Sequence, residues 1–469
     1  MSTNPTSTAQ ARLPVGEKIG YGLGDTASNI FFQFINIFLL YYYTDVFGLS
    51  PAAVGTMFVV ARFWDAVNDP LMGAIADRTQ TRFGKYRPYL LWMAVPFGLL
   101  GYLAFANPDF GQGGKLVYAY ATYIGLMMVY TAINVPYSAL MGVMTPSSSE
   151  RTSLSSYRFV GAFSGTLLIS LSVRPLVRLL GDGDEALGFK LTMALLSVVA
   201  VVFFLITFAS TRERIKPQPP EKDQSLGRDI KFLLKNRPWV IMVIAAILTL
   251  SNVAVRAAVT NHFFKYYVCD TGEPVFWFLD KTSLLLSSGA LAFIVGILFT
   301  SSLSKKFGKR NALMGLTILN GLTFLLFYFI PAQDYGLMLA VNILGNLLAG
   351  PTPALVWSIY TDVADYGEWR FGRRTTGLVF SAAMFAQKMG LTVGGGVAGW
   401  LLGSFGFVAN EQQSGTAILG IRLMFSILPG LLGIANGIIL LWYPLTDDHV
   451  AEIERDLAKR RASADAPAL

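Results

Sequence analysis

Two carboxylates, Asp65 and Asp69, lie one helical turn apart within the apolar stretch 51–76, which is long enough to cross a bilayer. Residues four apart share a helix face, and Asn68 lies on the same face. Charge at membrane depth is costly and usually marks function, and hard cations prefer oxygen ligands. The spacing therefore predicts a site for a small cation or a proton. A structural ion pair between Asp65 and Arg62, one turn earlier, is the alternative.

The composition indicates a membrane protein with many spans. Of the 469 residues, 53% are hydrophobic and only 14% are charged. The net charge of +8 does not indicate nucleic-acid binding, because the basic residues are spread over short loops instead of forming one patch. Residues 1–16 are polar and lack the apolar core of a cleavable signal peptide, so we expect the first span to direct insertion.

Apolar runs separated by short polar segments predict an all-α fold with about twelve transmembrane helices. The runs are 21–46, 51–76, 88–106, 115–142, 154–180, 188–210, 238–268, 282–303, 311–331, 335–361, 375–405 and 416–443. One long polar connection divides them six and six. The predicted parts are a cytoplasmic tail (1–20), a six-helix bundle (21–211), a cytoplasmic linker (212–237), a second six-helix bundle (238–444) and a cytoplasmic tail (445–469).

Basic residues predict the orientation in the membrane. They cluster after the second span (Arg78, Arg82, Lys85, Arg87) and after the eighth (Lys305, Lys306, Lys309, Arg310). The loops 47–50, 332–334 and 406–415 contain no Lys or Arg. The positive-inside rule therefore places both termini in the cytoplasm of a multi-pass protein of the cell (inner) membrane.

Two short strings recur at nearly the same separation in the chain. Phe83-Gly84-Lys85 recurs as Phe307-Gly308-Lys309, and Arg151-Thr152 recurs as Arg374-Thr375. Both pairs fall in predicted cytoplasmic loops, which favours an internal duplication. Two such bundles can rock around a central binding site.

Four sequence strings resemble the glycoside-pentoside-hexuronide:cation symporters, the melibiose-permease-like branch of the major facilitator superfamily. They are Tyr41-Tyr42-Tyr43-Thr44-Asp45-Val46, Trp64-Asp65-Ala66-Val67-Asn68-Asp69-Pro70, Phe83-Gly84-Lys85 and Asp365-Tyr366-Gly367-Glu368. The resemblance covers nearly the whole chain and implies the major facilitator fold. It also implies alternating-access symport of a neutral glycoside, xyloside or glucuronide with Na⁺, Li⁺ or H⁺, with no cofactor and with a monomer as the functional unit.

The resemblance also implies which residues bind the cation and the sugar. It places the cation on Asp65, Asn68, Asp69 and Thr131. The acidic sugar-binding positions of melibiose permease correspond to Asn29 and Asn134, which offer donors and acceptors without charge. The residues that we expect at the sugar site are Asn29, Gln33, Tyr130, Asn134, Arg158, Trp357 and Lys388. The alternatives are hydrogen bonding between helices for the polar residues and ordinary packing for the aromatic ones.

Two intramembrane cations and a set of loop charges complete the expectations. Arg158 is suited to a substrate carboxylate, and Lys388 is suited to offset Asp65 and Asp69 when no cation is bound. Charge pairs in the cytoplasmic loops are expected to hold an outward-open state, unless these residues only set the topology. Their members are Asp77, Arg78, Glu150, Arg151, Glu368 and Arg374.

Two other functions fit parts of the sequence. The pairs Asn68-Asp69 and Asp362-x-x-Asp365 resemble the aspartate pairs of Mg²⁺-dependent membrane prenyltransferases. One pair lies mid-span and the other at a cytoplasmic end, so they should not meet, and we expect no enzyme activity. A major-facilitator carrier for an amphipathic lipid or drug is the nearer alternative, and it would need a more apolar cavity. In either transporter the partners are a small molecule and the lipid bilayer.

Overall fold

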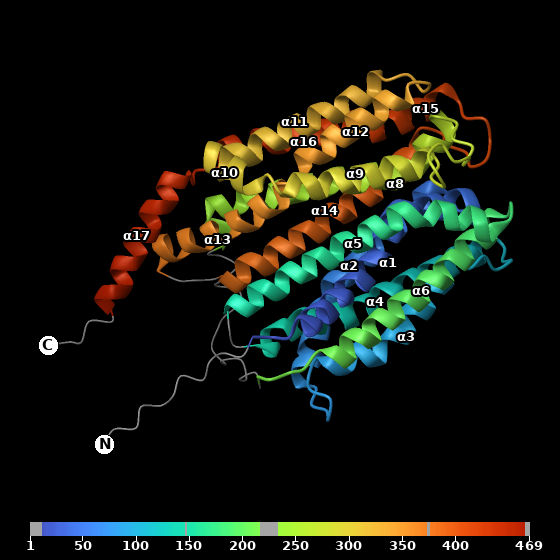
Figure 1. Cartoon of the computed structure of the whole chain (residues 1–469). Coiled ribbons are helices and arrows are strands. Elements are labelled where there is room, and N and C mark those ends of the chain that lie inside the picture. Colours follow the sequence, from blue (N-terminus) through green and yellow to red (C-terminus); the bar gives the residue numbers. More distant parts are fainter. Residues whose placement is uncertain (1–11, 146–147, 216–232, 373–375, 465–469) are drawn as a thin grey trace. The chain divides into compact units, whose positions relative to one another are not determined.

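A computed structural model describes residues 12–145, 148–215, 233–372 and 376–464 of the chain. These residues are helical almost throughout (Figure 1). The extended pairings found in this part of the chain are two isolated bridges, Thr81–Gly84 and Phe276–Leu279. The predicted all-α fold class is confirmed.

The helices follow the predicted runs closely. In the first half they are α1 (Val15–Tyr41), η1 (Tyr42–Val46), α2 (Pro51–Arg78), α3 (Arg87–Ala104), α4 (Gln112–Met144), α5 (Ser148–Gly181) and α6 (Glu185–Ser210). In the second half they are α8 (Arg237–His262), η2 (Phe263–Tyr267), α9 (Lys281–Ile297), α10 (Thr300–Phe307), α11 (Lys309–Phe329), α12 (Tyr335–Ala349), α13 (Thr352–Phe371), α14 (Thr376–Ser404), α15 (Gly415–Arg422), η3 (Leu423–Ile427), α16 (Leu428–Ile439), η4 (Leu440–Trp442) and α17 (Asp447–Ala464).

Each of the twelve predicted runs coincides with a helix or with consecutive helices. Within the described ranges, eight helical stretches are long and apolar enough to span a membrane, or nine if α9 and α10, bent by 52°, count as one. The charged residues Arg62, Asp65 and Asp69 lower the hydropathy of α2, which is not among the eight. The chain is a multi-pass membrane protein.

The chain forms two compact units. One contains the described residues within Met1–Ile35 and Phe63–Pro220, and the other contains those within Asn36–Arg62 and Glu221–Leu469. In the first unit α3 packs against α4 and α6, and α5 packs against α6. In the second unit α8 packs against α14 and α16, and α11 packs against α12 and α16. The division into bundles at 21–211 and 238–444 stays a prediction, because the tip of the α1–α2 hairpin groups with the second half.

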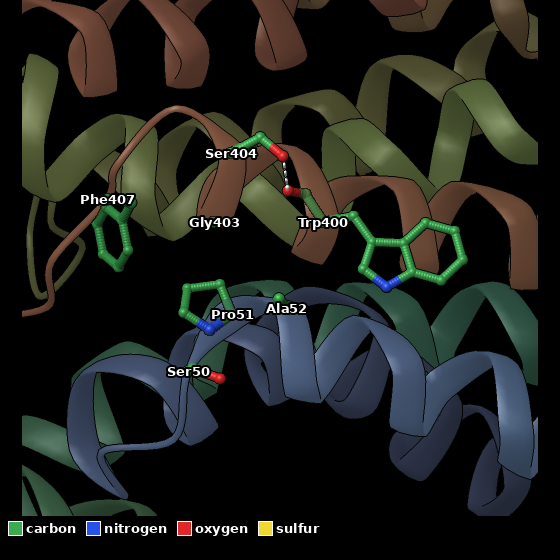
Figure 2. A pocket seen from close by; sticks show the side chains of 7 residues that line it. All are labelled: Ser50, Pro51, Ala52, Trp400, Gly403, Ser404 and Phe407. Carbon is green, nitrogen blue, oxygen red and sulfur yellow. Dashed lines mark hydrogen bonds between the residues drawn. The ribbon is translucent and has the colours of Figure 1, made fainter.

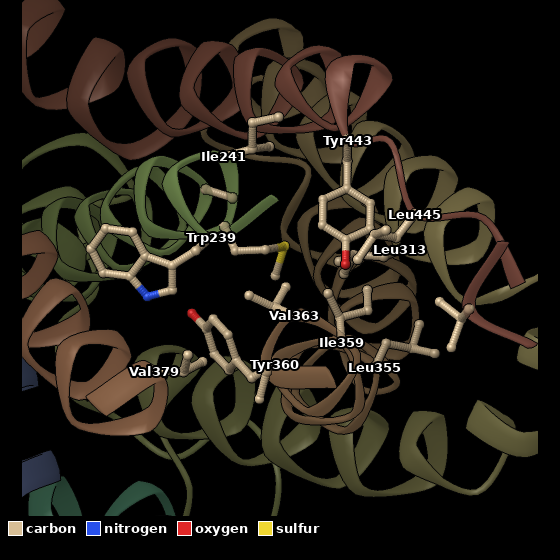
Figure 3. Close-up of a cluster of buried hydrophobic side chains, with 14 of the residues drawn as sticks. Trp239, Ile241, Leu313, Leu355, Ile359, Tyr360, Val363, Val379, Tyr443 and Leu445 are labelled. Carbon is tan, nitrogen blue, oxygen red and sulfur yellow. The ribbon is translucent and has the colours of Figure 1, made fainter. Parts of the chain in front are cut away.

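A large buried cluster supports the second unit near its α17 end. Trp239 of α8, Tyr360 and Val363 of α13, and Tyr443 lie in this cluster (Figure 3). Leu457 of α17 belongs to the same cluster, and α17 packs along α13. The charged C-terminal segment is therefore a helix docked on the second unit.

Helices α8 and α14 approach each other through glycine. A Cβ atom at Gly394 would lie 2.5 Å from the Ser251 carbonyl oxygen and 2.7 Å from the Ala254 Cβ atom. We expect Gly394→Ala to lower the free energy of unfolding by about 1–3 kcal/mol, because the helices must move apart. Thermal unfolding in micelles measures the effect. Gly315→Ala in α11 is the control, since a Cβ atom there meets nothing within 4 Å. An equal loss in both variants would contradict the packing argument.

Candidate functional site

The acidic turn of α2 lies beside α4 in the first unit. Asp65 is 4% exposed and Asp69 is half-buried. The Thr131 hydroxyl, from the buried face of α4, donates a 2.8 Å hydrogen bond to Asp69 Oδ1. Asn68 Nδ2 is buried and has no hydrogen-bond partner among the described residues. The fold thus brings the predicted hydroxyl ligand to the predicted carboxylates.

Polar side chains of α1 face α4 and α5. Asn29 Nδ2 donates to the Asp25 carbonyl oxygen at 2.9 Å, and Gln33 Nε2 donates to Thr166 Oγ1 at 3.2 Å. No hydrogen bond within the described ranges occupies the amide oxygens of Asn29 and Gln33. Both oxygens therefore remain acceptors that suit hydroxyl donors.

Asn134 continues this polar set from α4. Its Nδ2 donates to the Tyr130 carbonyl oxygen at 3.0 Å, and its Oδ1 accepts from the Ser28 hydroxyl at 2.9 Å. Ser28 was not among the predicted residues. The Tyr130 ring is half-buried, with its centroid 6.1 Å from that of Phe97. Asn29 and Asn134 are thus neutral residues held in place by hydrogen bonds to the first unit.

Arg158 of α5 has a carboxylate partner within the protein. Its Nε lies 3.4 Å from Asp25 Oδ1, and its guanidinium lies 5.2 Å from the ring centroid of Tyr137. The rings of Tyr21 and Tyr137 stack at 4.7 Å, and the Tyr137 hydroxyl donates to the Tyr21 carbonyl oxygen. Asp25 is 8% exposed. Asp25 lies one turn before Asn29 on the same helix face, but no sequence signal indicated its pairing with Arg158.

The other two predicted sugar-site residues lie in the second unit. Trp357 of α13 is half-buried, and its ring contacts that of Tyr360 edge-on at 5.9 Å. Lys388 of α14 is half-buried, and its carbonyl oxygen accepts from Thr392. Asn29, Gln33, Tyr130, Asn134 and Arg158 belong to the first unit, and Trp357 and Lys388 belong to the second.

The predicted gating charges are also distributed over both units. Glu150 pairs with Lys18, whose Nζ lies 2.9 Å from Glu150 Oε2, and it also accepts from the Leu13 amide. Lys18 was not predicted. Arg78 is exposed, and Arg151 and Glu368 are half-buried. The Asp77 side chain and the whole of Arg374 lie outside the described residues. The charge pairs predicted for these loops stay a prediction.

One pocket of about 600 Å³ lies in the second unit, between the start of α2 and the end of α14. Figure 2 shows Pro51 and Ala52 facing Trp400 and Phe407 across it. Its remaining lining residues are Ser50, Gly403 and Ser404. None of the predicted site residues lines this pocket, so it is a separate feature of the molecule.

Comparisons with known proteins agree with the fold. The family described as MFS/sugar transport protein matches residues 20–447. The putative glycoside/cation symporter YagG of Escherichia coli is 42% identical over 455 residues, which are 96% of each chain. The isoprimeverose transporter of Lactiplantibacillus pentosus is 34% identical over 99% of this chain and 96% of its own.

Two further comparisons involve a glucuronide carrier homolog and a solved transporter structure. The glucuronide carrier protein homolog of Escherichia coli is 31% identical over 94% of this chain and 95% of its own. The crystal structure of a D-xylose-proton symporter matches with a TM-score of 0.59 at 15% identity, covering 92% of this chain and 97% of that one. These relatives are transporters, which confirms the predicted transporter class over the prenyltransferase alternative.

Proposed function

Since the chain belongs to the MFS/sugar transport family, which matches residues 20–447, we propose that it couples uptake of a sugar or glycoside to Na⁺ or H⁺. The hydrogen bond from Thr131 to Asp69, beside the buried Asp65, carries this proposal. It joins hydroxyl and carboxylate oxygens from two helices in a mostly apolar protein. The similarity to a putative glycoside/cation symporter supports the same function.

The cation binds to oxygen atoms of α2 and α4. Two carboxylates and a hydroxyl, together with the amide oxygen of Asn68, form a ligand set suited to Na⁺ or Li⁺, and the carboxylates alone suffice for H⁺. The bound cation offsets the repulsion between Asp65 and Asp69. When the site is empty, that repulsion opposes the closed arrangement of the neighbouring helices.

Thr131→Val tests the contribution of the hydroxyl. Removing one neutral ligand while keeping both carboxylates should weaken Na⁺ activation of uptake by about tenfold, since a hydrogen bond to a charged group contributes about 1.5–3 kcal/mol. The Na⁺ concentration for half-maximal uptake in proteoliposomes measures the effect. Thr192→Val is a matched control, because Thr192 is a buried threonine of α6. Unchanged Na⁺ activation in Thr131→Val would remove Thr131 from the site.

The sugar binds to the neutral polar side chains of the first unit. Asn29, Gln33 and Asn134 present amide groups, and Asp25 neutralises the one nearby cation, Arg158, that the structure describes beside them. A site without net charge favours an uncharged glycoside over a glucuronide. The name of the isoprimeverose transporter supports a glycoside cargo, whereas that of the glucuronide carrier homolog leaves an acidic one within the family.

Cation and sugar favour one another's binding. The cation orders the α2–α4 contact, and Asn134 lies one turn after Thr131 on α4, so the two sites share a helix. Coupling of this kind is reciprocal. With both bound, the two halves close and reopen on the cytoplasmic side, so an ion gradient drives accumulation.

We place the monomeric transporter in the inner membrane with both termini in the cytoplasm. Uptake of labelled neutral glycosides and glucuronides into proteoliposomes, under an imposed Na⁺ or H⁺ gradient, tests the proposal. We expect uptake of a neutral glycoside with one of the two gradients. Uptake of detergent-like amphiphiles in place of every sugar would overturn it.

A further inference from the structure

The tip of the first helical hairpin, residues 36–62, is part of the second unit, although α1 and α2 both continue into the first unit. Side chains of the second half hold this tip. Asn261 Nδ2 donates to the Ile37 carbonyl oxygen at 2.7 Å, and Trp400 Nε1 donates to Thr56 Oγ1 at 3.1 Å. The two contacts connect the tip to α8 and to α14.

Asp45 lies at the centre of a polar cluster in this tip. Its side chain is fully buried. Lys265 Nζ lies 2.9 Å from Asp45 Oδ1, and the Tyr266 hydroxyl donates to the same oxygen. The Thr44 hydroxyl lies 2.7 Å from Asp45 Oδ2, and His262 Nε2 lies 3.3 Å from it. Both carboxylate oxygens of Asp45 therefore have hydrogen-bonding or charged partners. Three of these four partners, Lys265, Tyr266 and His262, come from the second half of the sequence.

Asn410 closes the cluster from the loop after α14. Its Nδ2 donates to the Asp45 carbonyl oxygen at 2.6 Å, and its Oδ1 accepts from Lys265 Nζ at 2.7 Å. The backbone amide of Asn410 donates to the Tyr266 hydroxyl at 2.8 Å. Three segments that are distant in the sequence thus meet around one carboxylate and one ammonium group.

Two unusual helical turns position these side chains. Asp45 lies in the π-helical turn η1, and Lys265 and Tyr266 lie in the π-helical turn η2. Such turns are rare, often occur at functional sites and change the direction of the side chains that follow. The hairpin tip and the second half therefore each carry a local irregularity at the point where they meet.

We propose that Asp45, Lys265, Tyr266 and Asn410 form a latch that holds the hairpin tip to the second half and breaks once in each transport cycle. The proposal rests on the function proposed above, in which the two halves move relative to each other, and it requires that α1 and α2 move with the first half. Charge-assisted hydrogen bonds are strong enough to favour one state. When the latch opens, water hydrates Asp45 and Lys265, so neither charge is left buried without a partner.

The packing beside the latch suits two surfaces that part and rejoin. A Cβ atom at Gly399 of α14 would lie 2.6 Å from the Pro51 carbonyl oxygen and 2.7 Å from the Cα atom of Gly55, so backbone meets backbone there. Such a contact separates without freeing interlocked side chains. The pocket of Figure 2 lies along the same contact, and its Phe407 ring is 5.2 Å from the rings of His262 and Tyr266.

Distances between two spin labels test the latch without requiring transport. Cys269, the single cysteine, is exposed just after η2, and Ser50 is exposed on the hairpin tip. Labels on Cys269 and on Ser50→Cys should give mainly a short distance in the otherwise native chain, with a minor population at a longer distance. Asp45→Asn should raise the population of the longer distance relative to the short one by about tenfold. Double electron–electron resonance in nanodiscs measures both populations.

Asp270→Asn is the matched control. Asp270 lies in the same loop region but accepts hydrogen bonds from Gly272 in its own loop and from Thr282 in the first turn of α9, so the distance distribution should not change. Asn410→Ala, at a loop position, should lengthen the distance as Asp45→Asn does and replaces it if that variant fails to fold. A native distribution in folded Asp45→Asn, Lys265→Gln and Asn410→Ala would overturn the latch. Failure of the native chain to take up any sugar would instead overturn the proposed function, because the label distances do not depend on cargo.

Discussion

Replacing Asp65 with alanine is expected to abolish gradient-driven sugar uptake while preserving the sugar affinity that is measured without the cation. Asp65 is a buried carboxylate on the face of α2 that carries Asp69, which Thr131 contacts. Without it the cation no longer favours sugar binding, and coupling of this kind typically changes affinity by about 5- to 150-fold. Uptake under an imposed gradient and sugar affinity with and without Na⁺, both measured on the same preparation, separate coupling from binding.

A double variant separates the cation site from the structural alternative. If Asp65 served only as the partner of Arg62, removing both charges in Arg62→Gln/Asp65→Ala should restore uptake, since no buried charge is left unpaired. A cation site predicts that the double variant stays uncoupled. Asp109→Asn, an exposed carboxylate in the loop after α3, is the control and should transport as the native chain does. Recovery in the double variant would refute the cation site.

The sequence predicted the helices well because apolar length is a direct requirement of the bilayer. The predicted runs 51–76 and 115–142 correspond to Pro51–Arg78 and Gln112–Met144. Interruptions were missed, since they depend on packing and not on composition. The run 282–303 contains the 52° bend between α9 and α10, and the π-helical turns η1 and η2 left no mark in the hydropathy pattern.

In the candidate site, features within one helix could be predicted from the sequence, whereas contacts between helices could not be predicted from spacing. The common face of Asp65 and Asp69 follows from helical spacing alone. The contact of Thr131 with Asp69 was expected only through the family resemblance, because it joins residues on two helices. The pairing of Asp25 with Arg158 was not predicted, since each residue is unremarkable in its own helix. In the sequence, Asp45 stood out only as part of one of the four strings that resemble the family. Its partners from η2 could be identified only from the structure.

Asp25→Asn should shift the substrate preference toward acidic sugars. In the native chain the carboxylate of Asp25 lies 3.4 Å from Arg158 Nε and offsets its charge beside Asn29 and Gln33. A charge pair at about this separation contributes about 4 kcal/mol at an effective dielectric constant of about 20. Removing the negative charge leaves a guanidinium suited to a glucuronide carboxylate. We expect the ratio of glucuronide to neutral-glycoside binding to rise by at least about tenfold, measured by competition against one labelled glycoside.

The charge of Arg158 has to cause any such gain, and this can be tested directly. In Asp25→Asn/Arg158→Gln both charges are absent, so the gain in glucuronide binding should disappear while neutral-glycoside binding persists. A gain that survives in the double variant would mean that Asp25 acts by repelling the substrate carboxylate and not by occupying Arg158. An unchanged ratio in folded Asp25→Asn would place the Asp25–Arg158 pair outside the sugar site, as a structural link between α1 and α5. The pair thus connects the fold of the first unit to the choice between neutral and acidic cargo, through one buried carboxylate.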